Sequence, residues 1–351
     1  MIKDFNIMDV TCRDGSYVNN FQISTQTQKN IGIGLENLGI KYFEIGHGMG
    51  IGAYRESNRK SLHTDLEYLQ CAQENTNTIK YGVFCIPGVA VLDDIKIAAD
   101  YGCSFIRIGS NVEDIDKTED FIKEAKKQGL YVMSNYMKSY ASTVNEFKEA
   151  VKKSESWGSE LIYIVDSAGG MLPKDIETYY SAIRDVSDLD IGFHGHDNIG
   201  MALSNSIYAL DLGIDFIDCS LQGLGRSAGN TSLEYMMIYL SKAGYDINID
   251  LIEMLLLSKK YVYPLVKQKG INPIDVECGI AGFHSSYLQD IHKVSAKYEV
   301  NPLRLIEEYS KVDRVNMDIV IAEEIAKRLC KEPESSYLMN FNDYFGCEQQ
   351  S

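Results

Sequence analysis

Two histidines one residue apart have the type and spacing of metal ligands. His194 and His196 stand in the segment HGHDNIG (194–200), directly after a short apolar run. Residues two apart on a strand point to the same side of it, so the two imidazoles should project together. Imidazoles commonly bind divalent ions, yet such a pair can equally be two hydrogen-bonded side chains at the end of a strand. The surrounding chain must decide between these interpretations.

A repeating pattern of strands and helices surrounds this segment. Eight short strand-like runs alternate with stretches of helical periodicity, several of which end at a glycine. Eight such units over about 240 residues fit a (β/α)₈ TIM barrel. The alternative, a doubly wound open sheet, would rarely hold eight strands at such even spacing. The predicted strands are residues 5–12, 42–48, 81–87, 105–110, 131–137, 161–167, 190–197 and 216–223.

The strand pattern stops near residue 245, and amphipathic helical segments follow it. We therefore expect three parts in the chain. A catalytic barrel should span residues 1–245, and a helical C-terminal region should span residues 246–336 and pack on the barrel. Residues 337–351 should form a tail.

Composition and charge exclude several classes of protein. The 351 residues carry a net charge of −16, which argues against binding to a nucleic-acid backbone. No apolar run reaches the roughly 20 residues that a membrane span needs, and the start of the chain lacks a signal peptide's apolar stretch. The eight cysteines form no C-x-x-C pair, so we expect reduced, structural thiols. These features predict a cytoplasmic protein that binds neither nucleic acid nor membrane.

Polar residues gather where the predicted strands end. In barrel enzymes the chemistry takes place at the carboxyl ends of the strands, and scattered surface polarity would not choose the same end of each strand. The residues concerned are Arg13 and Asp14 after the first strand, Glu44 and His47 after the second, Asp166 and Ser167 after the sixth, His194 to Asp197 after the seventh, and GLGRSAGN (223–230) after the eighth.

This placement favours a metal site. Closing the barrel puts the first strand two strands away from the seventh, so Asp14 should start about 10 Å from the two histidines, and their side chains can meet at one ion. Two imidazoles and one carboxylate leave open positions for a bidentate substrate. Such ligands do not select among Mn²⁺, Mg²⁺, Co²⁺ and Zn²⁺; we take Mn²⁺ as the expected ion. Arg13 would suit a substrate carboxylate or a developing enolate oxygen, or else a structural ion pair.

Seven segments together resemble the metal-dependent aldolases and acyl transferases that share an R-D-G motif and a histidine pair, the superfamily that includes lyases like HMG-CoA lyase. The resemblance covers the chain to about residue 330 and is closest to 4-hydroxy-2-oxovalerate aldolase. The segments are DVTCRDG (9–15), EIGHGMG (44–50), HTDLEYLQ (63–70), VDSAGGML (165–172), GFHGHDNIGMALSNS (192–206), SLQGLGRSAGNTSLE (220–234) and GIAGFHSSYL (279–288).

The resemblance implies roles for individual residues. Asp14, His194 and His196 would be the metal ligands. Asn230 would be a fourth ligand by analogy with a related lyase branch, although its glycine-rich segment can equally be a tight turn that starts a helix. Arg13 would stabilise the pyruvate enolate. Ser167 would lie near the bound keto acid, and we include His47 among the substrate-binding residues.

Two positions exchange residue types relative to the aldolase pattern. The family's catalytic histidine, two residues after the R-D-G glycine, is replaced by Tyr17, and a tyrosine of the C-terminal segment is replaced by His284. We therefore predict His284 as the base that takes the C4 hydroxyl proton, with Tyr17 orienting the aldehyde oxygen. The alternative is two independent substitutions in an enzyme with another substrate. Met49 and Asp197 are further departures, and they leave the aldehyde open.

The resemblance implies a class II aldolase that cleaves a 4-hydroxy-2-oxo acid to pyruvate and an aldehyde. The alternative is a Claisen-type acyl transferase resembling isopropylmalate or citramalate synthase. A non-catalytic scaffold would have no physical need for Arg13, Asp14 and the histidine pair. Relatives of the aldolase work with an acylating aldehyde dehydrogenase, so such a partner, or a homo-oligomer, is compatible with the sequence.

Overall fold

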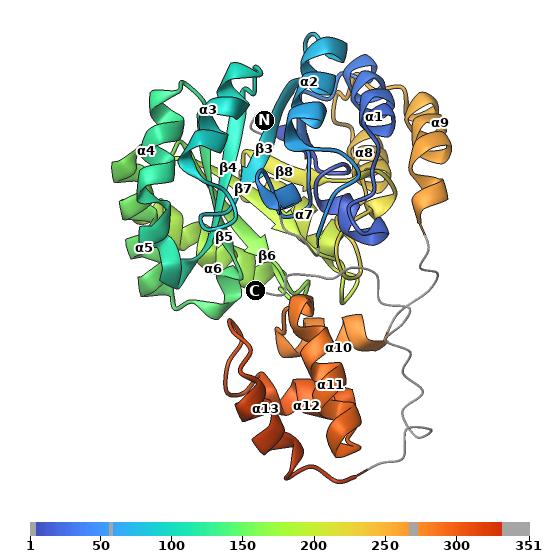
Figure 1. Cartoon of the computed structure of the whole chain (residues 1–351). Coiled ribbons are helices and arrows are strands. Elements are labelled where there is room, and N and C mark those ends of the chain that lie inside the picture. Colours follow the sequence, from blue (N-terminus) through green and yellow to red (C-terminus); the bar gives the residue numbers. More distant parts are fainter. Residues whose placement is uncertain (1–4, 56–58, 267–272, 332–351) are drawn as a thin grey trace.

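The computed structural model describes residues 5–55, 59–266 and 273–331, and it contains a closed parallel barrel. The strands follow one another around the barrel in chain order, from β1 to β8, and β1 pairs with β8, with Asn6 opposite Phe216 and Asp9 opposite Cys219 (Figure 1). The TIM-barrel prediction is confirmed. The strands are β1 (Asn6–Asp9), β2 (Tyr42–Ile45), β3 (Lys80–Cys85), β4 (Phe105–Asn111), β5 (Tyr131–Met137), β6 (Leu161–Asp166), β7 (Asp190–Gly195) and β8 (Phe216–Cys219).

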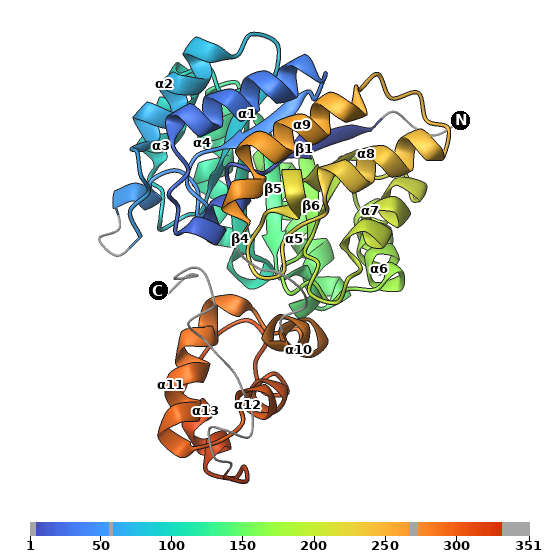
Figure 2. The same cartoon turned by 90° about the vertical axis from the view of Figure 1, so that its right-hand side faces the viewer.

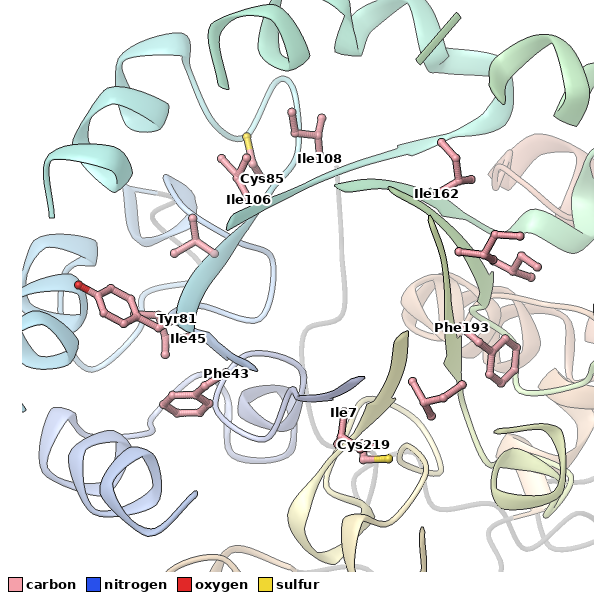
Figure 3. Packing of buried hydrophobic residues seen from close by; sticks show 14 of the residues in the cluster. Ile7, Phe43, Ile45, Tyr81, Cys85, Ile106, Ile108, Ile162, Phe193 and Cys219 are labelled. Carbon is pink, nitrogen blue, oxygen red and sulfur yellow. The ribbon is translucent and has the colours of Figure 1, made fainter. Parts of the chain in front are cut away.

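Side chains alternate between the two faces of the barrel wall. The apolar residues in Figure 3 point from the strands toward the surrounding helices and belong to the main hydrophobic core. Because successive residues of a strand face opposite sides, the residues between them point into the barrel. Arg107 stands between Ile106 and Ile108 and is fully buried. A second apolar cluster, which includes Met133 and Tyr163, fills part of the barrel interior.

Several helices around the barrel begin at residues whose side chains cap them. Thr64 and Thr143 each accept a hydrogen bond from the backbone three residues on, and a glutamate returns the bond, which forms a capping box. The helices that cover the barrel are α1 (Thr25–Asn37), α2 (Asp65–Asn75), α3 (Leu92–Asp100), α4 (Glu119–Lys127), α5 (Val144–Trp157), α6 (Pro173–Arg184), α7 (Ala202–Asp211) and α8 (Leu233–Lys242).

The region after the barrel is helical, as predicted, and divides into two parts. Helix α9 (Leu251–Tyr261) lies beside α1 and α8 on the outside of the barrel (Figure 2). The following helices share a hydrophobic core of their own and lie beyond one end of the barrel (Figure 1). They are α10 (Pro273–Ala281), α11 (Leu288–Tyr298), α12 (Pro302–Tyr309) and α13 (Ile319–Ala326). The predicted tail, residues 337–351, lies outside the described residues.

Six of the eight hydrogen-bonded strands end earlier than predicted, at the end that carries the chemistry, whereas β4 and β5 do not. The first run, residues 5–12, pairs only over Asn6–Asp9, because the chain then turns into a short 3₁₀ helix, Asp14–Asn19. Seven of the eight cysteines lie in the described ranges, and these are free thiols. Within those ranges no helix has the length and apolar character needed to cross a membrane.

Candidate metal centre

Three buried side chains converge at the carboxyl end of the barrel. Asp14 follows β1, His194 lies in β7, and His196 follows that strand directly. One ligand atom from each of the three lies within 4.8 Å of the others. The backbone N–H of Asp14 donates to the Val10 carbonyl at 2.9 Å, so the turn after β1 fixes where this carboxylate stands. These residues form a candidate site for a divalent ion.

The orientation of both imidazoles suits metal binding. Nδ1 of His194 lies 2.7 Å from the Asp218 carboxylate, and Nδ1 of His196 lies 3.1 Å from the Gly229 carbonyl. Because both partners can only accept, each Nδ1 carries the proton and each Nε2 keeps its lone pair. The two Nε2 atoms are 3.3 Å apart. Metal–nitrogen bonds of about 2.1 Å are long enough for both atoms to reach one ion across this separation.

The charge states of the cluster also fit an ion. Burial lowers the pKa of His196 well below its ordinary value, and the Arg226 charge lowers it further, so the imidazole is neutral. Burial raises the pKa of Asp14, but the neighbouring charges of Arg13 and Arg226 oppose this, and the pKa is held below its usual range. A neutral imidazole and an ionised carboxylate are the forms that bind metals.

Asn230 stands beside the acidic ligand. Its amide nitrogen donates to Oδ2 of Asp14 at 2.8 Å, and its Oδ1 is a buried oxygen that has no hydrogen-bond partner among the described residues. Its backbone forms an isolated bridge with that of His196. A side chain at Gly225 would clash with the Asn230 amide, so the glycine-rich segment allows this approach. The unpartnered oxygen is compatible with Asn230 as a further ligand.

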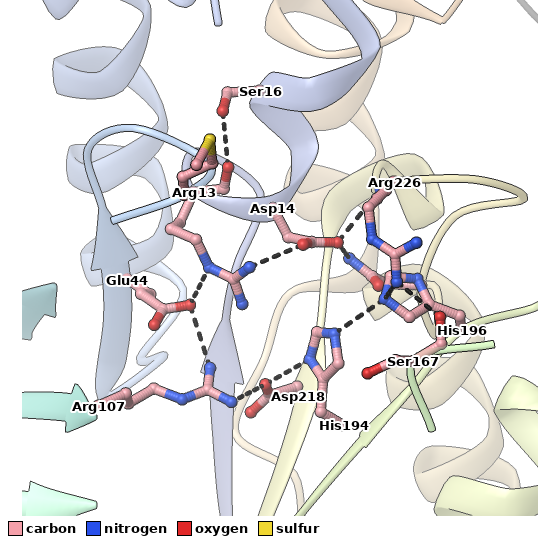
Figure 4. Close-up of polar contacts among 12 residues, drawn as sticks. Arg13, Asp14, Ser16, Glu44, Arg107, Ser167, His194, His196, Asp218 and Arg226 are labelled. Carbon is pink, nitrogen blue, oxygen red and sulfur yellow. Dashed lines mark hydrogen bonds and ion pairs between the residues drawn. The ribbon is translucent and has the colours of Figure 1, made fainter. Parts of the chain in front are cut away.

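A chain of alternating charges links the ligands behind the site (Figure 4). Arg13 donates from Nη1 to Asp14 and from Nε to Glu44, each at 2.7 Å. The guanidinium of Arg107 lies 3.0 Å from the Glu44 carboxylate and 2.8 Å from the Asp218 carboxylate. Asp218 in turn accepts from His194. Each of these side chains is at most 7% exposed. The network therefore fixes the orientation of Arg13 and His194 relative to each other.

A cavity of about 40 Å³ opens over the ligand cluster. Its lining contains the cluster together with Arg13, Tyr17, Ser167 and His284. The structure thus brings the two positions with exchanged residue types into one site: Tyr17 on the 3₁₀ helix Asp14–Asn19 and His284 in the segment before α11. The Ser167 hydroxyl accepts from the backbone N–H of Lys138 at 3.0 Å, which fixes it at this wall of the cavity.

Comparison with known proteins agrees with this geometry. The model of the HMGL-like family matches residues 4–260. The chain belongs to this family. It is 32% identical over 332 residues to the 4-hydroxy-2-oxovalerate aldolase of Pseudoalteromonas translucida, covering 94% of this chain and 96% of the relative. The aldolase of the same name from Bacillus cereus is 31% identical over 334 residues, with 93% and 97% covered. This chain is therefore an aldolase-type member of the HMGL-like family.

A solved structure in this group has the same fold. The N-terminal domain of a candidate aldolase from Bacteroides vulgatus superposes with a TM-score of 0.72 at 26% identity, and the match covers 84% of this chain and 98% of that one. The expected resemblance to 4-hydroxy-2-oxovalerate aldolases is confirmed.

Three residues singled out in the sequence lie away from the cavity. The ring of His47 stacks on Phe21 with centroids 4.0 Å apart, and its Nε2 lies 2.7 Å from the Arg59 carbonyl, so the structure does not bring His47 into the cavity. The Met49 sulfur accepts from Arg59 at 3.1 Å. Asp197 accepts from the backbone N–H of Ala202 at the start of α7, 2.9 Å away.

Sequence reasoning assigned no role to three charged residues of this HMGL-like site. Arg107 and Asp218 stand in the segments FIRIGS and FIDCS, which were interpreted only as apolar strands. The alternation along each strand could have identified them. A charged residue that stands between two apolar residues facing the helices must itself point into the barrel. Arg226 was included only as part of a glycine-rich turn, and its guanidinium lies 3.1 Å from Nε2 of His196.

Proposed function

We propose that this protein is a divalent-metal-dependent aldolase that cleaves a 4-hydroxy-2-oxo acid to pyruvate and an aldehyde, in either direction. The observation that carries this proposal is the buried cluster of Asp14, His194 and His196 with Arg13 beside it in one cavity. Identity of about 30% to 4-hydroxy-2-oxovalerate aldolases over nearly the whole chain supports the same reaction class.

We propose Mn²⁺ as the ion, held by Asp14, His194 and His196, with Asn230 as a further ligand. Mg²⁺, Co²⁺ and Zn²⁺ have compatible ligand chemistry. When bound, the ion would supply Lewis acidity toward the carboxylate and carbonyl oxygens of the 2-oxo acid.

The roles proposed for the other residues follow the movement of electrons. In cleavage the C3–C4 bond breaks, the hydroxyl on C4 loses its proton and becomes the aldehyde carbonyl, and the bonding pair forms the pyruvate enolate, which is then protonated at C3. Arg13 stabilises the enolate oxygen, because its guanidinium is fixed by Asp14 and Glu44. Ser167 holds the keto acid, and Tyr17 orients the aldehyde oxygen.

His284 accepts the hydroxyl proton in this scheme. Burial lowers the pKa of His284 well below its ordinary value, and the charges of Arg226 and Lys138 lower it further, so the imidazole is neutral and can accept a proton. Nδ1 of His284 accepts from the backbone N–H of Ser286 at 3.3 Å and lies 2.6 Å from the Ser286 hydroxyl. Because a backbone N–H can only donate, the lone pair of the neutral ring lies on Nδ1, next to a hydroxyl that can pass a proton to it.

We keep the acylating aldehyde dehydrogenase and self-association as predictions about partners. Size-exclusion chromatography with light scattering would measure the oligomer. Adding an aldehyde dehydrogenase with coenzyme A and NAD⁺ would show whether it consumes the released aldehyde faster when mixed with this protein.

The proposal is tested by cleavage of 4-hydroxy-2-oxovalerate. The purified protein is incubated with this acid and Mn²⁺, and pyruvate is measured with lactate dehydrogenase and NADH. We expect pyruvate release that EDTA abolishes and that added Mn²⁺ restores. A matched reaction with His196→Ala should form no pyruvate above background. Cleavage that is equally fast in EDTA would contradict the proposed metal-dependent reaction.

A further inference from the structure

Arg226 is a buried cation at the edge of the ligand cluster, and its side chain is 5% exposed. Its Nη2 lies 3.1 Å from Nε2 of His196 and donates to the Ser167 carbonyl at 2.6 Å, while Nη1 donates to the Ser285 hydroxyl. Ser285 is the neighbour of His284 in the chain. The guanidinium therefore reaches from the ligand cluster to the segment that carries the proposed base.

Arg226 and Arg13 approach the site from different sides. Figure 4 shows the two guanidinium groups on either side of Asp14. Arg13 packs on the ring of Phe84, with 4.8 Å from its Cζ to the ring centroid, so its side of the cavity is partly apolar. Arg226 belongs to the segment after β8 and contacts Ser285 of the C-terminal region. The side of Arg226 therefore carries polar groups from the C-terminal region.

A second cation lies on the side of Arg226. Lys138 follows β5 and is 6% exposed. Burial lowers the pKa of Lys138 to about 8, which leaves its ammonium group mostly protonated at pH 7. Nζ of Lys138 donates to the Tyr287 hydroxyl at 3.1 Å, and the ring centroid of Tyr287 lies 6.1 Å from that of His284. Arg226 contacts Ser285, the next residue after His284, so both cations lie near that imidazole. A neutral aldehyde has no charge to offset two buried cations, whereas a carboxylate would form charge-assisted hydrogen bonds with them.

We infer that Arg226, supported by the charge of Lys138, binds a second carboxylate at the far end of the substrate. The substrate is then a 4-hydroxy-2-oxo dicarboxylic acid, and the aldehyde released from it carries a carboxylate. The inference rests on the proposed function, in which Arg13 serves the 2-oxo acid end and His284 serves the C4 hydroxyl. The planar guanidinium of an arginine matches a carboxylate with two parallel hydrogen bonds.

The larger cleft next to this cavity is unsuited to the second carboxylate. It has a volume of about 560 Å³ and shares Met137 with the cavity. Its lining contains two lysines, Lys138 and Lys153, but also four acidic residues, so it carries a net negative charge that disfavours an anion. The acidic residues are Glu113, Asp116, Glu146 and Glu149. The far end of the substrate is therefore expected at Arg226.

The inference is tested by binding two six-carbon acids that differ in one group. 2-Oxohexanedioate carries the second carboxylate and 2-oxohexanoate does not, and neither can be cleaved because both lack the C4 hydroxyl. Calorimetric titration into the Mn²⁺-loaded protein should show the dicarboxylate binding about 10-fold or more tighter. In Arg226→Met this ratio should fall to near 1, and Arg226→Lys should give an intermediate ratio. The exposed Arg328→Met serves as the matched control and should keep the ratio of the parent protein.

The possible results separate this inference from the proposed function. Equal affinity for both acids in the parent protein, or a preference that survives in Arg226→Met, overturns the inference alone. Equal weakening of both acids in Arg226→Met also overturns it, because Arg226 would then bind the carboxylate that both share. If EDTA leaves the binding of both acids unchanged, the proposed metal-dependent function fails as well.

Discussion

The Asp218 carboxylate lies 2.7 Å from Nδ1 of His194, and this contact points Nε2 of His194 toward Nε2 of His196. Asp218 in turn is held by Arg107 at 2.8 Å. Burial raises the pKa of Asp218, but the charges of Arg107 and its contact with His194 outweigh this and keep the pKa below its ordinary value, so Asp218 is an acceptor. The ligand geometry thus depends on a residue that need not touch the ion.

Replacing Asp218 with Asn should weaken ion binding. The amide no longer offers a charged acceptor to Nδ1 of His194, so the tautomer and orientation of this ligand become less defined. We expect the affinity for Mn²⁺ to fall about 10- to 100-fold, measured by calorimetric titration. The exposed Asp188→Asn is the matched control, and circular dichroism checks that both variants fold. An unchanged affinity in Asp218→Asn would show that the contact does not position His194.

Replacing Arg107 with Met should destabilise the fold. Arg107 is fully buried between the carboxylates of Glu44 and Asp218, and its removal leaves both without their shared cation. The expected loss in the free energy of unfolding is about 3–5 kcal/mol, measured by urea denaturation. Arg107→Lys, which keeps the charge, should lose less.

Lys96→Met is the control for Arg107, because Lys96 forms only an exposed ion pair with Asp93. It should leave the free energy of unfolding nearly unchanged. A loss in Arg107→Met no larger than that of this control would mean that the charge network contributes little to stability.

Replacing His284 with Ala should remove cleavage and keep ion binding. His284 lines the cavity but is not one of the three clustered ligands. Loss of a general base should lower kcat about 10²- to 10⁴-fold, measured by pyruvate release, while the Mn²⁺ affinity stays close to that of the parent. The exposed His292→Ala is the matched control. Turnover retained in His284→Ala would rule out the proposed exchange of roles with Tyr17.

The barrel and its ligand cluster could be predicted because they rest on local patterns. Strand periodicity predicts which side chains share a face, and closure of the barrel brings Asp14 to His194 and His196. The charge network could not be predicted in the same way. Which acid faces Arg107 depends on the stagger of strands far apart in the sequence, and that is set by the packing of the whole barrel.

The position of His47 shows the same limit. Its place after β2 predicted a role in the cavity, but the turn that follows directs its ring onto Phe21. Strand ends are well predicted as a group, whereas the direction of each side chain in the loop that follows depends on tertiary contacts.

Stability should fall as the pH rises because of Asp65. Burial raises the pKa of Asp65 to about 7, although the carboxylate accepts from the Gly52 N–H at 2.6 Å. Between about pH 4 and pH 7 the folded protein keeps a proton that the unfolded chain releases, so this group loses stability as the pH rises through that window. A shift of about 3 pKa units corresponds to at most about 4 kcal/mol.

Asp65→Asn tests this effect, because the amide oxygen can still accept from Gly52. We expect the variant to gain stability over the parent at pH 8 and to show little difference at pH 4.5, measured by urea denaturation at both values. Comparing the variant with its parent isolates Asp65 from other buried acids. A difference that is the same at both pH values would refute the expected linkage.

The central claim is that the Asp14, His194 and His196 cluster supports metal-assisted enolisation of pyruvate. The most direct measurement follows the pyruvate methyl signal by NMR in D₂O, with the purified protein and Mn²⁺, and needs no knowledge of the aldehyde. We predict loss of this signal as protons exchange, and no loss in EDTA or with His196→Ala. Absence of exchange in protein that has bound Mn²⁺ would contradict the claim and favour the acyl-transferase alternative, in which an acetyl thioester is enolised.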